Sequence, residues 1–299
     1  MIRFFLILAY CLLVSCGSGD TVDESVIETS DPVVEEVEEV PFSVTIDERD
    51  LVILPKDTGG EHLAVEFKDT EAPFGYYIYE PEFYREVEHD YPLLLFLHGW
   101  HPNLGDEPLR NVLVDGPPKL IQRKQWNPKF PLLVVSPQLR QSYWYSHEIH
   151  AFIKYLIKTY RVNPERIYLT GLSLGGGGCW YYVGEYEDNY AAAIVPISAS
   201  GNPGLIDNLT KVPIWAFHGG KDTTVKAYED FGSVPMVLTI NDNNPEIRAR
   251  VTVYDNVGHN AWSMTYDGSG TRYRDQSYDT FDMDIYEWML AYKKSDQKE

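Results

Sequence analysis

The stretch Ile167-Tyr-Leu-Thr-Gly-Leu-Ser-Leu-Gly-Gly176 joins a short apolar run to a serine that has a glycine two residues away on each side. Within it, Gly171-Leu-Ser-Leu-Gly175 is a G-x-S-x-G motif, which is typical of a nucleophile elbow: a strand ends, the chain turns sharply and a helix begins. The serine of such a turn has a cramped backbone conformation, and side chains at the two glycine positions would collide with the neighbouring strand or helix. The pattern therefore predicts a buried strand over residues 166–170 and an exposed hydroxyl on Ser173.

Two later segments supply an acid and an imidazole in matching positions. The apolar run 213–217 leads into a glycine turn that carries Asp222, and the run 250–254 leads into a loop that carries His259. Serine, aspartate and histidine in this order, each after the carboxyl end of a predicted strand, are expected of an α/β-hydrolase. We therefore predict a catalytic triad in which His259 takes the proton of Ser173 and Asp222 orients the histidine.

Further assignments complete the expected site. Asp255 is an alternative for the acid, but it lies only four residues before His259 at the same strand end, so Asp222 is favoured. The two backbone N–H groups of an oxyanion hole are assigned to Leu174, which directly follows the serine at a helix N-terminus, and to Trp100, which follows an early apolar strand.

Several segments, taken in chain order, carry a family resemblance. They are Leu95-Phe-Leu-His-Gly99, Gly116-Pro-Pro-Lys-Leu-Ile121, Val134-Val-Ser-Pro-Gln138, Tyr160-Arg-Val-Asn-Pro-Glu-Arg-Ile-Tyr-Leu-Thr-Gly-Leu-Ser-Leu-Gly-Gly176, Trp215-Ala-Phe-His-Gly219 and Gly258-His-Asn-Ala-Trp262. With them the chain resembles the bacterial carboxylesterases near dienelactone hydrolases and feruloyl or acetylxylan esterases, over roughly residues 75–292. The resemblance implies an α/β-hydrolase fold, with a mostly parallel sheet flanked by helices, ester hydrolysis through the predicted triad and oxyanion donors, and no cofactor.

Two segments depart from that family's pattern. Trp100-His-Pro-Asn-Leu-Gly105 stands where many relatives have a charged Gly-Glu-Arg-Gly-like stretch, so the rim of the acyl pocket differs. Between Asp222 and His259, Pro235 and the cluster Asn241-Asp-Asn-Asn-Pro245 predict a shorter, broken helix in place of a long regular one.

The N-terminus predicts export. Arg3 precedes an apolar run over residues 4–14, which is too short for a permanent membrane span. The run ends in Leu13-Val-Ser-Cys16, which resembles the bacterial lipobox, and an ordinary signal peptide with an incidental cysteine is the alternative. We predict a lipoprotein signal peptide over residues 1–16 and a lipid anchor on Cys16 that holds the protein to a membrane leaflet. Gly17 does not resemble an inner-membrane retention signal, which favours the outer membrane, with a periplasmic or surface-facing orientation.

Residues 17–41 contain nine acidic residues and no basic one, which predicts an extended, disordered linker. Residues 42–299 are then long enough for one catalytic α/β domain. The whole chain carries a charge of −20; removing the linker's nine negative charges and the positive charge of Arg3 leaves −12 for the domain. Such a surface argues against nucleic acid and polyanionic substrates as partners. Cys179 is the one cysteine outside the predicted signal peptide, so we expect no disulfide.

The remaining aromatic and histidine residues give weaker signals. Trp144 and Trp262 follow predicted strand ends, so we expect both to line the cleft around Ser173 and to offer stacking faces to a sugar ring or an aromatic acid. His147 and His150 have a spacing that suits a metal, but no third ligand is evident, so no metal site is predicted.

Alternating apolar runs predict an α/β order of elements, with antiparallel pairing among the first strands. Strands are expected at 43–46, 62–67, 76–79, 93–97, 132–135, 166–170, 192–197, 213–217 and 250–254, and helices near 117–125, 147–160, 175–186 and 282–293.

These features together predict a serine carboxylic-ester hydrolase that works through an acyl-enzyme on Ser173. The expected substrates are feruloyl or acetyl esters of plant polysaccharides, or other short-chain or polymeric esters. A prolyl-oligopeptidase-like serine peptidase uses the same triad and is one alternative, although no segment is large enough for the propeller that usually restricts access to it. A catalytically inactive glycan-binding lipoprotein is another.

Overall fold

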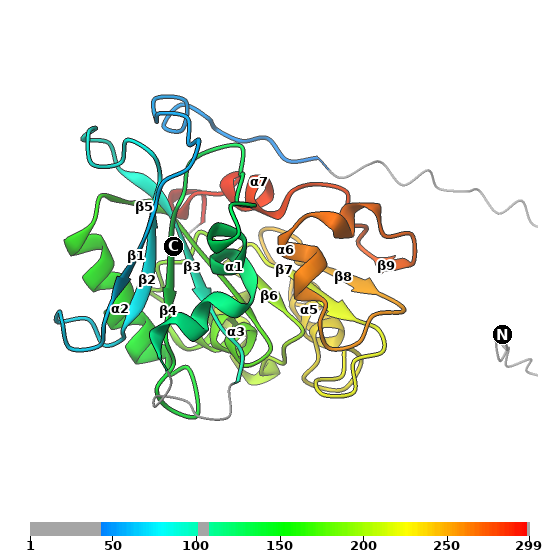
Figure 1. Ribbon diagram of the computed structural model, residues 1–299. Helices are drawn as coiled ribbons and strands as arrows, with labels where there is room; N and C mark the ends of the chain where they lie inside the picture. Colours follow the sequence, from blue (N-terminus) through cyan, green and yellow to red (C-terminus); the bar gives the residue numbers. More distant parts are fainter. Residues whose placement is uncertain (1–42, 101–107, 298–299) are drawn as a thin grey trace, which may run out of the picture. The chain divides into compact units, whose positions relative to one another are not determined.

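The computed structural model describes residues 43–100 and 108–297, and residues 43–299 form one unit (Figure 1). The predicted signal peptide with Cys16 and the linker over residues 17–41 lie outside the described residues, and so do residues 101–107. None of the helices in the described ranges has the length and apolar character needed to cross a bilayer.

The described strands form a single sheet in the order β1-β2-β4-β3-β5-β6-β7-β8-β9. The strands are β1 (Glu61–Val65), β2 (Tyr76–Glu80), β3 (Tyr91–Leu97), β4 (Leu133–Pro137), β5 (Val162–Leu172), β6 (Ala193–Ile197), β7 (Trp215–Gly219), β8 (Arg250–Tyr254) and β9 (Gln276–Tyr278). From β4 to β8 every neighbouring pair is parallel, whereas β1, β2 and β9 pair antiparallel at the two edges. The chain therefore has the mostly parallel α/β sheet, with antiparallel first strands, that its sequence predicts.

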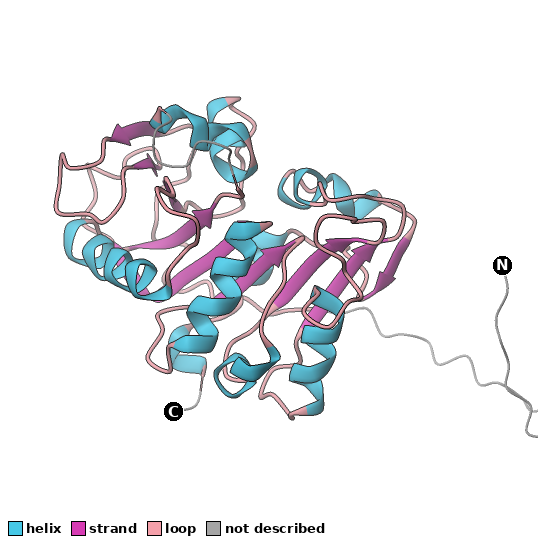
Figure 2. Cartoon of the chain, turned by 90° about the horizontal axis from the view of Figure 1, so that it is seen from below, coloured by secondary structure: helices cyan, strands magenta, loops and turns pink. Residues whose placement is uncertain are grey.

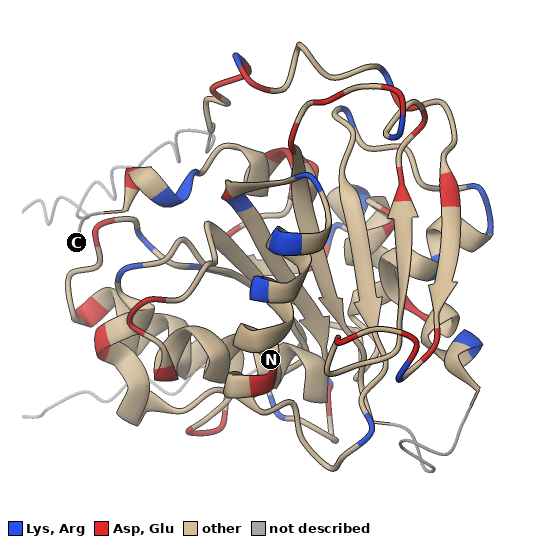
Figure 3. Cartoon of the chain, turned by 90° about the vertical axis from the view of Figure 1, so that its left-hand side faces the viewer, with Lys and Arg blue, Asp and Glu red and all other residues tan. Residues whose placement is uncertain are grey.

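Helices cover both faces of the sheet, as Figure 2 shows from below. The helices are α1 (Gly116–Gln122), α2 (Ser146–Thr159), α3 (Leu174–Glu185), α4 (Ile206–Leu209), α5 (Ser233–Asp242), α6 (Trp262–Tyr266) and α7 (Ile285–Leu290), with 3-10 turns at Leu109–Val114, Pro203–Leu205, Ser269–Arg272 and Lys294–Asp296. Helices α2 to α5 contact one another in sequence along one layer, and α1 contacts α6 in the other. Because both faces are covered, central strands such as β3, β4 and β6 are buried at every residue. Charged residues lie mainly in the surrounding loops and helices (Figure 3).

A buried arginine attaches the first described segment to the sheet. Arg166 on β5 has no exposed side-chain surface and forms an ion pair of 2.7 Å with Asp50. Its other N–H groups donate to the carbonyl oxygens of Asp47 and Leu290. Residues 43–46 do not form the strand that their sequence predicts, and none of the described strands pairs with them. The bonds from Arg166 hold the residues that follow this segment, Asp47 and Asp50.

The helix between Asp222 and His259 also differs from the prediction. Helix α5 runs unbroken through Pro235, because this proline lies in the first turn, where backbone N–H groups have no acceptor within the helix. The helix ends at Asp242, within the asparagine cluster that was expected to end it. The short elements β9, α4 and α6 were not predicted.

Candidate active site

Ser173 lies in a strained turn between β5 and α3. Its backbone has φ 51° and ψ −120°, a conformation that is rare for a residue with a side chain. The two flanking positions require glycine, because their surroundings leave no room for a side chain. A Cβ on Gly171 would overlap the backbone of Gly175, and a Cβ on Gly175 would overlap the carbonyl group of Leu97. The sequence therefore folds into the elbow geometry that its glycines predict.

The structure brings together the three side chains that the sequence assigned to a triad. The Oγ of Ser173 lies 2.9 Å from Nε2 of His259, and Nδ1 of His259 lies 2.7 Å from Oδ2 of Asp222. Because a carboxylate only accepts hydrogen bonds, Nδ1 carries the proton and Nε2 is free to accept from the serine hydroxyl. This is the arrangement that activates a serine as a nucleophile.

The carboxylate of Asp222 is buried and fully surrounded by hydrogen-bond donors. Its Oδ1 accepts from the backbone N–H groups of Thr224 at 2.8 Å and Val225 at 3.0 Å. Its Oδ2 accepts from His259 and lies 3.2 Å from Nε2 of His218. Burial acts to raise the pKa of Asp222, but the contacts with His218, His259 and the two backbone groups outweigh it and lower the pKa to about 2.

His218 is the residue at this site whose position the sequence did not predict. His98, which directly follows β3, accepts at Nε2 a hydrogen bond from the backbone N–H of Leu139. His218, on β7, lies against Asp222, the candidate acid. Its position four residues before Asp222, at the end of a buried strand, was the available signal.

Asp255, the alternative acid, lies elsewhere in the structure. Its carboxylate accepts a hydrogen bond of 2.6 Å from the hydroxyl of Ser277, whereas the bond from His259 goes to Asp222. The geometry therefore favours Asp222, as the sequence did.

Both residues assigned to the oxyanion hole lie near Ser173. Leu174 is the first residue of α3, so its N–H has no acceptor within the helix. Trp100 follows β3 through Gly99, and a Cβ built on Gly99 would lie 3.5 Å from Cβ of Ser173. Trp100 and Ser173 also line the same two cavities.

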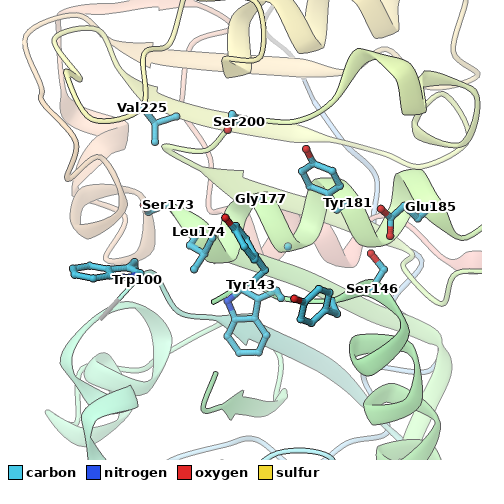
Figure 4. Close-up of a pocket in the computed structure, with 13 residues that line it drawn as sticks. Trp100, Tyr143, Ser146, Ser173, Leu174, Gly177, Tyr181, Glu185, Ser200 and Val225 are labelled. Atoms are coloured by element: carbon cyan, nitrogen blue, oxygen red, sulfur yellow. The ribbon is translucent and has the colours of Figure 1, made fainter. Parts of the chain in front are cut away.

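The larger cavity has a volume of about 610 Å³ and runs from Ser173 along α3 (Figure 4). Leu174, Gly177, Tyr181 and Glu185 line it at spacings of three or four residues, so they share one helix face. The aromatic residues in its wall are Trp100, Tyr143, Trp144, Tyr145 and Tyr181.

Trp144 lines this cavity, as its sequence suggested, but it exposes little of its side chain. Only 5% of the residue is exposed, and its indole N–H donates to the carbonyl oxygen of His98 at 3.0 Å. A Cβ on Gly178 of α3 would lie 2.8 Å from Cβ of Trp144. Trp144 is therefore a fixed part of the wall, whereas Tyr143, Tyr145 and Tyr181 are more exposed.

A second cavity of about 240 Å³ meets the first at Ser173 and Trp100. His259, Trp262, Asp115 and Thr224 line it. The rings of Trp262 and His259 lie edge to face, 5.2 Å apart, and the indole N–H of Trp262 donates to Asp115 at 3.3 Å. Trp262 thus lies next to His259, in the smaller cavity.

The other residues considered from the sequence lie apart from this site. His150 stacks on Tyr186 at 4.6 Å, and within residues 43–100 and 108–297 no group of histidine, cysteine and acidic residues could hold a metal ion. Cys179 is buried and free, and burial raises the pKa of its thiol.

Comparison with known proteins gives matches at the level of structure. No family model and no curated protein matches the sequence. A thermostable esterase superposes with a TM-score of 0.54 and 21% identity, covering 79% of this chain and 63% of its own, so the chain spans less than two thirds of that protein. The feruloyl esterase module from Clostridium thermocellum, in a structure with sinapinate, gives a TM-score of 0.53 and 15% identity over 87% of this chain and 96% of the module. These likenesses, together with the sheet order, show that the chain has an α/β-hydrolase fold.

Proposed function

We propose that this protein is a serine-dependent carboxylic-ester hydrolase. The observation that carries the proposal is the unbroken series of bonds from Ser173 through His259 to Asp222. His259 takes the proton of the serine hydroxyl as Oγ attacks the ester carbonyl carbon, and the N–H groups of Leu174 and Trp100 stabilise the oxyanion. His259 then gives the proton to the leaving alkoxide, and water releases the acid from Ser173 by the same steps in reverse.

The two cavities support an orientation for the ester. His259 lines the smaller cavity, and among the described residues it does not line the larger one. Since His259 must protonate the leaving oxygen, the alcohol part of the ester lies in the smaller cavity, near Trp262 and Asp115. A carboxylate and an indole face suit a sugar alcohol, which offers hydroxyl donors and a ring surface.

The acyl group then lies in the larger, aromatic cavity. The stretch of α3 from Leu174 to Glu185 is about 16 Å long at the usual helical rise, which gives room for an aromatic or extended acyl group. Glu185 and the net charge of −20 disfavour anionic substrates. A feruloyl ester of a plant polysaccharide fits these requirements, and the C. thermocellum module, which has the same fold, is a feruloyl esterase.

A panel of p-nitrophenyl acetate, methyl ferulate and feruloylated oligosaccharides tests the proposal. Wild-type protein is expected to hydrolyse all three, and Ser173→Ala none. Tyr181→Ala is expected to lower kcat/KM for the feruloyl esters about two- to tenfold, the worth of an aromatic contact, and to leave the acetate rate unchanged. Tyr228→Ala is the control, because Tyr228 is exposed and pairs with Tyr278 outside both cavities. Folded wild-type protein that is inert toward esters but cleaves peptide amides would favour the peptidase instead.

We also propose that Cys16 carries lipid and that residues 17–41 act as a spacer between the membrane and the catalytic domain. The lipobox-like sequence and the nine acidic residues behind it support this. Mass spectrometry of the membrane fraction is expected to find a lipidated cysteine as the first mature residue. An unmodified N-terminus would contradict the proposal.

A further inference from the structure

His218 is fully buried and contacts the acid of the candidate triad, although the proposed mechanism assigns it no step. Its two ring nitrogens face different partners. Nδ1 lies 2.8 Å from the hydroxyl of Ser233 in α5, and Nε2 lies 2.8 Å from the carbonyl oxygen of Val225. Since a carbonyl oxygen only accepts, Nε2 must carry a proton whichever way the serine hydroxyl points.

The bonds around His218 form a closed ring with the segment that carries Asp222. Nε2–H of His218 donates to the carbonyl group of Val225, and the N–H of Val225 donates to Oδ1 of Asp222. The ring closes where Oδ2 of Asp222 lies 3.2 Å from Nε2 of His218. The Nε2–H group of His218 lies between the carbonyl oxygen of Val225 and the carboxylate of Asp222, and it attracts both. It therefore keeps the segment that carries Asp222 at a fixed distance from β7.

The same carboxylate oxygen accepts the proton of His259 at 2.7 Å. Any rotation of the Asp222 side chain would move Oδ2 away from His259 and release the imidazole that activates Ser173. Ser233 fixes the far side of the His218 ring, and its hydroxyl also lies 3.1 Å from the carbonyl oxygen of Ala199. A continuous series of contacts therefore runs from Ser233 in α5 through His218 to Asp222.

We propose that His218 is a positioning residue, whose Nε2–H holds the Asp222 segment so that the carboxylate meets His259. This inference rests on the proposed function. Substitution should lower kcat and leave KM for a small ester nearly unchanged, because His218 itself is not among the described residues that line either cavity.

Two substitutions distinguish the effect of the Nε2 hydrogen bond from the effect of side-chain volume at position 218. The amide nitrogen of glutamine can reach the position of Nε2, whereas that of asparagine reaches only the position of Nδ1. In the full chain, His218→Asn is expected to lower kcat for p-nitrophenyl acetate about 10- to 100-fold, a common effect of losing a supporting bond, which is less than the about 10⁴-fold effect of losing the acid. His218→Gln should retain most of the wild-type kcat.

Proton NMR gives a second readout. The low-field resonance of the His259 Nδ1 proton is expected in wild type and in His218→Gln, and should be shifted or lost in His218→Asn. A folded His218→Asn variant with wild-type kcat, or equal losses in both variants, would overturn the inference.

One measurement does not depend on the variants folding. In wild-type protein with ¹⁵N-labelled histidine, Nε2 of His218 should be protonated; an unprotonated Nε2 would overturn the inference. The labelling of wild type by a fluorophosphonate, and its absence in Ser173→Ala, tests the proposed function separately. If wild type is labelled and active, and His218→Asn has the same kcat, only the role of His218 is refuted.

Discussion

The substitution Asp222→Asn tests the role of the acid most sharply, because four donors surround this side chain. Oδ1 accepts two backbone N–H groups, and Oδ2 accepts from His259 and lies near Nε2–H of His218. Asparagine has one oxygen and one NH₂ group in the same places. With the oxygen toward Thr224 and Val225, the NH₂ group faces Nδ1 of His259, which must then accept.

An accepting Nδ1 moves the proton of the neutral imidazole to Nε2, where it points at the Oγ of Ser173, only 2.9 Å away. A histidine in this form cannot take the serine proton. In serine hydrolases the loss of the correct tautomer lowers kcat by about 10⁴-fold, which corresponds to about 5.5 kcal/mol at 1.36 kcal/mol per factor of ten. The fold should persist, since the replacement is nearly isosteric.

Initial rates on p-nitrophenyl acetate at neutral pH, with circular dichroism as the check on folding, measure this effect. Asp255→Asn is the matched control, because Asp255 bonds Ser277, and it should retain wild-type turnover. Folded Asp222→Asn protein with kcat within tenfold of wild type would show that Asp222 does not set the tautomer of His259. A large loss in Asp255→Asn would indicate that Asp255, not Asp222, is the acid.

Four further predictions concern folding and reactivity. Gly175→Ala places a methyl group against a β3 carbonyl and should leave little folded protein by circular dichroism, whereas Gly177→Ala, whose added Cβ would meet its nearest neighbour at 3.7 Å, should fold. Arg166→Met breaks a buried ion pair and should lower the free energy of unfolding in urea by about 3 kcal/mol or more; an unchanged value would contradict the role given to this bond. Burial raises the pKa of Asp50, but the bond from Arg166 and the other contacts outweigh it and lower the pKa from 3.8 to about 2, so its stabilisation should be present above pH 4 and disappear as the pH falls through 2, a dependence that Asp50→Asn should remove. Cys179 should resist thiol reagents in the native protein and react only after unfolding; fast labelling without unfolding would show that it is not buried.

The central strands could be predicted because burial on both faces makes their sequences continuously apolar, as in Leu93–Leu97. The edge of the sheet carries no such signal. Strand β9 consists of only three residues, Gln276–Tyr278, two of which are polar, and it forms because β8 offers an open edge. Segment 43–46 shows the opposite error: its sequence has a strand-like pattern, but none of the strands in the described ranges pairs with it, and Arg166 bonds the backbone of Asp47 directly after it.

In the site, too, features set by neighbouring residues in the sequence could be predicted, whereas features set by contacts in space could not. Strain and close packing at Ser173 demand glycines at fixed spacing, so the elbow can be recognised from a few residues. Burial of Trp144 against His98 depends on how separate strands end in space. The contact of His218 with Asp222 lies within one turn after β7, but it depends on how that turn folds. The sequence alone has no periodic pattern that records such contacts.

Covalent labelling of Ser173 measures directly whether His259 and Asp222 make its hydroxyl reactive. The wild-type chain is incubated with a fluorophosphonate, digested, and analysed by peptide mass spectrometry; His259→Ala and heat-unfolded protein are the controls. One adduct, on Ser173, is expected in native wild type, with slow or no labelling in both controls. Native protein that carries no adduct on Ser173, or that is labelled equally after unfolding, would contradict the claim that His259 and Asp222 make this hydroxyl reactive.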